Sequence, residues 1–144
     1  MSKLLASRGS QNVQCAEFTF EFDDTMLDTS GALQDFGKTN VASTVFEVVN
    51  LPPEAVVVGG DLITDTAFDA ATYNVSVGDA DSATRYLGAT DKKGAGRTAL
   101  VPTGFKSAGN LRITVVPADA CTTGKMTLRV LFITPNRITE AYPS

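Results

Sequence analysis

Alternation of apolar and polar residues is the clearest pattern in the chain, and it is strongest in residues 110–117 and 125–134. Apolar residues occupy every second position of both runs, and most of the residues between them are threonine or arginine. This period of two is typical of β-strands with one buried face, and the loop between the runs predicts neighbouring antiparallel strands. The second run is apolar on both faces from Val130 to Ile133, which predicts a central strand covered on both sides.

The N-terminal half contains a second strong strand signal, in residues 15–23. Phe18, Phe20 and Phe22 share one face, and each can bury about 150–250 Å², so this strand is expected to anchor a core or an interface. Other β-branched and aromatic runs predict strands at residues 41–51, 55–66, 72–78, 83–89 and 97–101.

Turn-forming residues separate these runs and complete the prediction. Gly59 and Gly60 interrupt one run and indicate a β-bulge or a bend between two sheets. Residues 83–89 are expected to pair with residues 72–78. Residues 24–37 lack periodicity and predict a loop, with at most one helical turn at residues 32–36.

About eight short strands, with turns every 8–12 residues, predict an all-β fold. We expect a two-sheet antiparallel sandwich. A jelly roll is the first choice because it has eight strands, and an immunoglobulin-like sandwich is second because the chain contains no tryptophan. The domain prediction is an N-terminal arm at 1–14, a sandwich at 15–135 and a C-terminal tail at 136–144. The arm and the tail are expected to lie on neighbouring subunits, with a frayed terminus as the alternative for residues 1–14.

Composition and charge narrow the range of functions. The 144 residues fit one domain, and the net charge of −4 argues against nucleic-acid binding, which needs a basic face. No apolar run reaches the ~18 residues of a membrane span, and the N-terminus has no apolar segment typical of a signal peptide. We therefore expect synthesis in the cytoplasm, where Cys15 and Cys121 stay free thiols.

The sequence offers little catalytic chemistry. It contains no histidine, which excludes Ser-His and Cys-His nucleophile pairs and Cys/His zinc sites within one chain. Asp79 and Asp81 resemble the start of a calcium loop, but no glutamate follows at the required spacing, so we interpret them as a solvated turn. Asp23, Asp24 and Asp28 are interpreted as a polar strand exit. We predict no catalytic, metal or cofactor site, and no enzyme activity.

Four segments between residues 72 and 137 carry a family resemblance. They read Tyr73-Asn-Val-Ser-Val-Gly-Asp, Arg85-Tyr86-Leu-Gly-Ala, Gly109-Asn-Leu-Arg-Ile-Thr, and Gly124-Lys-Met-Thr-Leu-Arg-Val-Leu-Phe-Ile followed by Arg137. This pattern resembles small virion proteins of tailed bacteriophages, and the length and strand count are similar to jelly-roll cement (decoration) proteins. The resemblance implies a non-enzymatic role outside an icosahedral capsid, with assembly in the host cytoplasm and no functional residue to carry over.

On this interpretation the partners are the major capsid protein and a second copy in a symmetric dimer, with no nucleic acid and no membrane. The contacts are expected on the two arms and on a basic Gly-rich loop, although the residues of this loop by themselves favour an ordinary solvated turn over a contact patch. The candidate contact residues are Lys3, Leu4, Leu5, Arg8, Lys92, Lys93, Arg97, Arg137, Ile138 and Tyr142.

Two other functions remain open at this point. A carbohydrate- or receptor-binding jelly-roll module of a phage fibre or tail would need exposed aromatic residues beside polar loops, and Tyr86 is the candidate. A histidine-free glycosidase would need two carboxyl groups about 5–9.5 Å apart across a cleft.

Overall fold

The computed structural model describes residues 13–52, 54–104, 106 and 109–134, which form strands and no helix. No helix that could cross a membrane occurs in this part of the chain. The ten strands found there are β1 (Gln14–Glu21), β2 (Thr25–Leu27), β3 (Leu33–Asp35), β4 (Thr44–Val49), β5 (Val56–Thr66), β6 (Tyr73–Gly78), β7 (Leu87–Asp91), β8 (Gly96–Ala99), β9 (Leu111–Pro117) and β10 (Lys125–Ile133).

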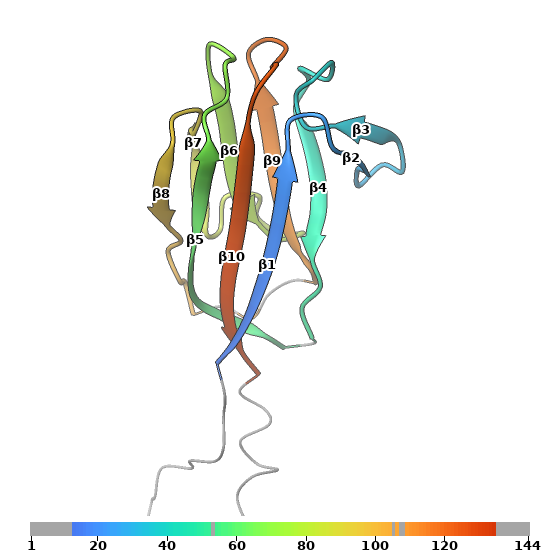
Figure 1. Cartoon of the computed structure of the whole chain (residues 1–144). Coiled ribbons are helices and arrows are strands. Elements are labelled where there is room, and N and C mark those ends of the chain that lie inside the picture. Colours follow the sequence, from blue (N-terminus) through green and yellow to red (C-terminus); the bar gives the residue numbers. More distant parts are fainter. Residues whose placement is uncertain (1–12, 53, 105, 107–108, 135–144) are drawn as a thin grey trace, which may run out of the picture.

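Eight of these strands form two four-stranded sheets that pack face to face (Figure 1). Sheet 1 has the order β1-β10-β5-β8 and sheet 2 the order β4-β9-β6-β7, while β2 and β3 form a separate hairpin. When β2 and β3 are left out, the remaining strands can be numbered 1 to 8 in chain order. Sheet 1 then has the order 1-8-3-6 and sheet 2 the order 2-7-4-5, which is the jelly-roll order. The all-β sandwich and its jelly-roll topology are confirmed. The immunoglobulin-like alternative is wrong, because that fold places its first two strands side by side in one sheet.

One predicted pairing is also wrong. Strand β9 pairs with β4 and β6, whereas β10 pairs with β1 and β5, so the two runs lie in opposite sheets. Alternation reports only that each strand has one buried face, and two facing sheets satisfy this as well as two paired strands. The loop at residues 118–124 crosses between the sheets, and its Cys121 is buried and donates its N–H to the carbonyl of Gly37. The central position of β10 is confirmed, but the expected cover on both faces is not, because its outward residues Leu131 and Ile133 are only half-buried. The pairing of residues 72–78 with the next run is confirmed as β6 with β7.

The segment expected to be a loop with a helical turn is the β2–β3 hairpin. Residues 33–35 are extended rather than helical. The Asp28 carboxylate accepts hydrogen bonds from the N–H and hydroxyl of Ser30 and from the N–H of Ala32, which closes the turn between the two strands. The turn is therefore held by hydrogen bonds from a side chain to the backbone, and such bonds leave no apolar periodicity by which the sequence could predict the hairpin.

The core lies between the two sheets and includes a column of aromatic rings. The Phe36 ring stacks on Phe20 from sheet 1 and on Phe46 from sheet 2, with both centroid distances at 4.2 Å. Tyr73 is fully buried, and its hydroxyl donates to the carbonyl of Phe36. The predicted β-bulge in β5 is confirmed, because the register of β5 against β10 shifts beside Gly59.

The described ends of the chain meet at one end of sheet 1, which we call the foot. Strand β1 begins there with Gln14 opposite Phe132, and β10 ends there with Ile133 opposite Val56 (Figure 1). Gln14, predicted to belong to the N-terminal arm, is thus the first residue of β1. The first and last described residues of the chain therefore lie close together at the foot.

Candidate interaction surfaces

Four charged side chains form a row across the outer face of sheet 1. The register aligns Glu17 of β1 with Arg129 of β10 and Asp61 of β5. Arg129 Nε lies 3.2 Å from Glu17 Oε2 and 3.7 Å from Asp61 Oδ1, and Arg97 of β8 also forms an ion pair with Asp61. The two arginines cover Asp61, which is only 7% exposed. Two acids and two bases tie all four strands together and leave this part of the face neutral.

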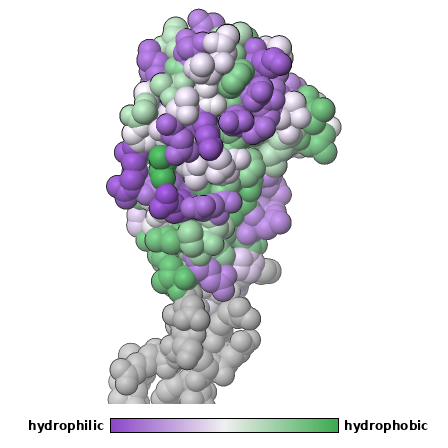
Figure 2. Space-filling model, in the orientation of Figure 1, coloured by the Kyte–Doolittle hydropathy of each residue, from purple (hydrophilic) through white to green (hydrophobic). Residues whose placement is uncertain are grey.

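Below this row, the outer face of sheet 1 becomes apolar. Figure 2 shows hydrophilic side chains across the middle of the molecule and hydrophobic ones gathered near the foot. The foot patch comprises Val13 and Val58, which are 56% and 38% exposed, with half-buried Leu131 and Ile133. Leu131 lies in the same register row as Cys15, an exposed free thiol on β1. The apolar surface therefore lies beside the residues where the chain enters and leaves the sandwich.

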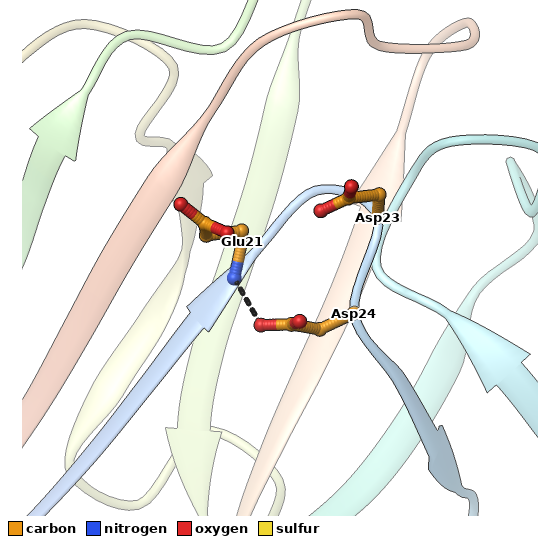
Figure 3. Close-up of side chains that lie close together, drawn as sticks. All are labelled: Glu21, Asp23 and Asp24. Carbon is orange, nitrogen blue, oxygen red and sulfur yellow. Dashed lines mark hydrogen bonds between the residues drawn. The ribbon is translucent and has the colours of Figure 1, made fainter.

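The other end of β1 carries a group of acids. Carboxyl oxygens of Glu21, Asp23 and Asp24 lie within 4.8 Å of one another on an exposed turn (Figure 3). Asp24 has a structural task, because its Oδ2 accepts the N–H of Glu21 at 2.7 Å. The interpretation of this region as a polar strand exit is confirmed for Asp23 and Asp24, which follow β1 directly.

A small hollow lies between the upper part of β1 and the β2–β3 hairpin. Phe18 and Phe20 line it from β1, and Met26 and Phe36 line it from the hairpin and the residue after it, around a volume of about 250 Å³. Phe18 stays half-buried, although the stacked rings of Phe20 and Phe36 beside it are buried. The sequence pattern identified the phenylalanine face but not Met26 or Phe36, because both lie in the segment without periodicity.

The β2–β3 hairpin projects from the side of the sandwich (Figure 1). Leu27 and Leu33 oppose each other across its two strands and are 59% and 65% exposed. Met26, the neighbour of Leu27, packs instead against the core. The hairpin thus has an inner face that joins the sandwich and an outer face that presents two leucines to solvent.

The structure locates three of the ten predicted contact residues. Lys92 and Lys93 follow β7, and Arg97 lies in β8, where it pairs with Asp61. Lys93 Nζ donates to the carbonyl of Ala71 at 2.7 Å, so this lysine and Arg97 already hold parts of the fold together. The other seven residues lie outside the described part of the chain: Lys3, Leu4, Leu5, Arg8, Arg137, Ile138 and Tyr142.

The turn interpreted as solvated is held by a buried carboxylate. Asp79 is 2% exposed, accepts the N–H groups of Asp81 and Ser82, and lies 2.9 Å from Arg85 Nε. The prediction of a solvated turn is therefore wrong for Asp79. Its partners are protein groups that fix the turn, which leaves this carboxylate with a structural role.

The aromatic residue proposed as a sugar platform is also buried. Tyr86 is 1% exposed and Tyr73 is fully buried, so neither tyrosine in the described residues can stack on a sugar. Both cysteines are free thiols, as expected, and burial raises the pKa of Cys121. The surfaces that remain as candidates are the edge of β1 with its hollow, the foot patch and the outer face of the hairpin.

Comparisons with known proteins give a fold match. No protein-family model matches the sequence, and the search of curated proteins found no match. The chain is similar to one in the capsid asymmetric unit of cyanophage Pam1, with a TM-score of 0.57, 23% identity, and coverage of 94% of this chain and 93% of that one. A chain in the capsid of Ralstonia phage GP4 gives a TM-score of 0.55 at 15% identity, covering 93% and 91%. A chain in the acid-stable capsid of Helicobacter pylori bacteriophage KHP30 gives 0.56 at 22% identity, covering 85% and 88%. Because the sequence identities are low, these comparisons show only that this chain and the three capsid chains share a fold over most of their lengths.

Proposed function

We propose that this chain is a non-enzymatic structural protein of a bacteriophage virion. It binds the outside of the icosahedral capsid as a symmetric dimer and cements neighbouring major capsid subunits. The observation that carries the proposal is the fold match to chains of three phage capsid structures, with TM-scores of 0.55–0.57 and at least 85% of each chain covered.

The described surfaces suit a protein that works by adhesion. The molecule offers a rigid sandwich with an apolar patch at its foot and a hairpin whose outer face exposes Leu27 and Leu33. A cement protein is present in many copies on one shell, so contacts that are individually weak combine through their high effective concentration. The Asp79 carboxylate, which resembled the start of a calcium loop in the sequence, forms an ion pair with Arg85 within the fold.

The location is tested on virions of the phage or prophage that encodes the chain. Antibodies raised against the recombinant protein should label the heads of purified particles in immunogold electron microscopy, and mass spectrometry should detect the chain at high copy number. Labelling of tails or fibres would favour the receptor-binding alternative. Absence of the chain from purified particles would contradict a virion role altogether.

The cementing activity is tested with particles that lack the chain. We expect such capsids to release their DNA at a lower temperature than complete ones, and added full-length protein should restore the higher temperature. If the protein binds at full occupancy and the release temperature does not change, cementing is excluded and the role is reduced to decoration.

A further inference from the structure

Strand β1 is the edge of sheet 1, and the direction of its unpaired backbone groups can be read from one residue. The N–H of Glu21 donates to Asp24 Oδ2 at 2.7 Å, and the carbonyl of Glu21 accepts the N–H of Asp24 at 3.1 Å. The peptide groups of Glu21 therefore point away from β10. Because these directions alternate along a strand, the groups of Thr19, Glu17 and Cys15 point the same way.

This edge is open to another strand. Among the described residues, no acceptor outside sheet 1 receives a hydrogen bond from the outward N–H groups of Cys15, Glu17 and Thr19. Asp24 occupies the next outward N–H, at Glu21, and so limits the open edge to the lower part of β1. An unpaired edge is a template for strand addition, in which the backbone supplies the hydrogen bonds and a nearby pocket selects a side chain.

The hollow beside this edge provides such a pocket. Its walls are Phe18 and Phe20 of β1 with Met26 and Phe36, and its volume of about 250 Å³ accommodates an aliphatic side chain. Asp24 also lines the hollow. The exposed carboxyl groups of Glu21 and Asp23 lie within 4.8 Å of the Asp24 carboxyl group, so this end of β1 is acidic (Figure 3). The matching strand should therefore be basic and carry an aliphatic residue.

Residues 1–12 have this composition. They contain Lys3 and Arg8 and no acidic residue, and they include the pair Leu4-Leu5. The C-terminal residues 135–144 carry one arginine and one glutamate, so their charges offer no such match. We infer that the open edge of β1 and its hollow bind residues 1–12 of a second copy of this chain as an added antiparallel strand.

The geometry of the foot favours exchange between copies. If two sandwiches meet foot to foot about a two-fold axis, the segment preceding β1 of one copy continues straight along the β1 edge of the other, antiparallel to it. The same segment could reach its own β1 edge only by reversing its direction. Each of these pairings would occur twice, as two-fold symmetry requires.

The lengths agree with this arrangement. Leu4 and Leu5 precede Val13 by eight or nine residues, which span about 26–30 Å as a strand. Phe18 lies four residues above Gln14, or about 13 Å from the foot, which leaves roughly 15 Å for the gap between the copies. Placing Leu5 opposite Phe18 puts Arg8 opposite Cys15.

The inference deepens the dimer of the proposed function, but its test needs no capsid. If the exchange is absent, the immunogold experiment still decides the virion location independently. Sedimentation equilibrium of the full chain should show a dimer. Deletion of residues 1–12 should raise the dimer dissociation constant at least tenfold, whereas deletion of residues 136–144, the matched control, should leave it within twofold. A monomeric full chain, or a dimer that is unaffected by the first deletion, would overturn the inference.

Crosslinking identifies the occupant of the edge. Two forms of the chain are mixed. The first carries a mass tag and the substitutions Arg8→Cys and Cys15→Ser, and the second keeps Arg8 and Cys15, so the disulfide that tests the pairing joins position 8 of the first chain to Cys15 of the second. The Cα atoms of opposed residues at such a position lie about 5.5 Å apart, within disulfide range. Mild oxidation of the mixture should give a reducible dimer of one tagged and one untagged chain. Ala99→Cys, on the opposite edge of sheet 1, replaces Arg8→Cys in the control and should give none.

A third chain has Arg8→Cys and keeps its own Cys15. An intrachain disulfide in this chain, together with no mixed dimer in the first experiment, would show that residues 1–12 fold back on their own β1, and would overturn exchange. The absence of both products would exclude residues 1–12 from the edge.

Discussion

Gly60 lies in β5 close to the backbone of β10. Its φ is +130°, and a Cβ at this position would lie 2.2 Å from the backbone oxygen of Arg129. The backbone of β10 cannot move aside without disturbing its pairing with β5. We expect Gly60→Ala to lower the free energy of unfolding by about 2–4 kcal/mol, from the strained φ and the overpacking together.

Urea titration followed by circular dichroism measures this effect. Gly94→Ala is the matched control, because nothing lies within 4 Å of a Cβ built at Gly94. Its unfolding free energy should change by less than about 0.5 kcal/mol. Equal effects of the two substitutions would mean that the close approach of β5 to β10 does not limit this position.

Asp35 makes the stability depend on pH. Partial burial raises the pKa of its carboxyl, but hydrogen bonds from the Thr39 hydroxyl and from the N–H groups of Asn40, Gly37 and Thr39 outweigh this and lower the pKa to about 2. The pKa in the unfolded chain is the ordinary 3.8. A lowered pKa in the folded state stabilises the protein above pH 3.8, and this stabilisation is lost as the pH falls from about 5 to about 2.

We therefore expect Asp35→Asn to be less stable than the unaltered protein at pH 7, by roughly 1–2 kcal/mol after allowance for solvent screening. This difference in unfolding free energy should shrink between pH 4 and pH 2. Asp81→Asn is the control, because the Asp81 side chain accepts no hydrogen bond from the described residues, and its unfolding free energy at pH 7 should lie within about 0.5 kcal/mol of that of the unaltered protein. A difference for Asp35→Asn that is constant from pH 7 to pH 2 would contradict this account.

At the scale of the element, the sequence predicted most strands correctly but could not sort them into sheets. The alternation located β9 and β10, and their placement in opposite sheets depends on the crossing loop with buried Cys121. The β2–β3 hairpin was missed for another reason. Its turn is fixed by the Asp28 carboxylate, whose pKa is lowered by the Ser30 hydroxyl, rather than by a periodic apolar face.

The two faces of the hairpin should respond differently to substitution. Met26 packs against the core, whereas Leu33 is 65% exposed. We expect Met26→Ser to lower the free energy of unfolding by about 1–2 kcal/mol, because a half-buried side chain loses part of the usual 2–5 kcal/mol. Leu33→Ser should change it by less than about 0.5 kcal/mol. Chemical denaturation of both variants checks this, and a larger loss for Leu33→Ser would mean that the outer face also packs within the monomer.

At the scale of the whole molecule, the candidate surfaces arise where segments distant in sequence meet. The alternation of Phe18, Phe20 and Phe22 predicted an aromatic face, but the hollow beside β1 also needs Met26 and Phe36 from the hairpin segment. Likewise the foot patch combines both described ends of the chain with β5. A linear pattern shows which residues face inward, but it does not show which ends and edges the topology leaves uncovered.

Phe36 also links the hairpin to the sandwich as a whole. Its ring lies between Phe20 of sheet 1 and Phe46 of sheet 2, at 4.2 Å from each, so one side chain from the insertion bridges both sheets. We expect Phe36→Ala to lower the free energy of unfolding by about 3–5 kcal/mol, because it leaves a cavity between two stacked rings. Hydrogen exchange should accelerate in β2 and β3 and also at the upper ends of β1 and β4.

Phe22→Ala is the comparison for this variant, because Phe22 is half-buried and stacks on no ring among the described residues. It should cost about half as much, and its faster exchange should stay within sheet 1. If the two variants lose equal stability and hydrogen exchange changes only in the β2–β3 hairpin, then the hairpin covers the sandwich without linking its two sheets. In that case the hollow would be a gap beneath a loosely attached hairpin rather than a pocket with rigid walls.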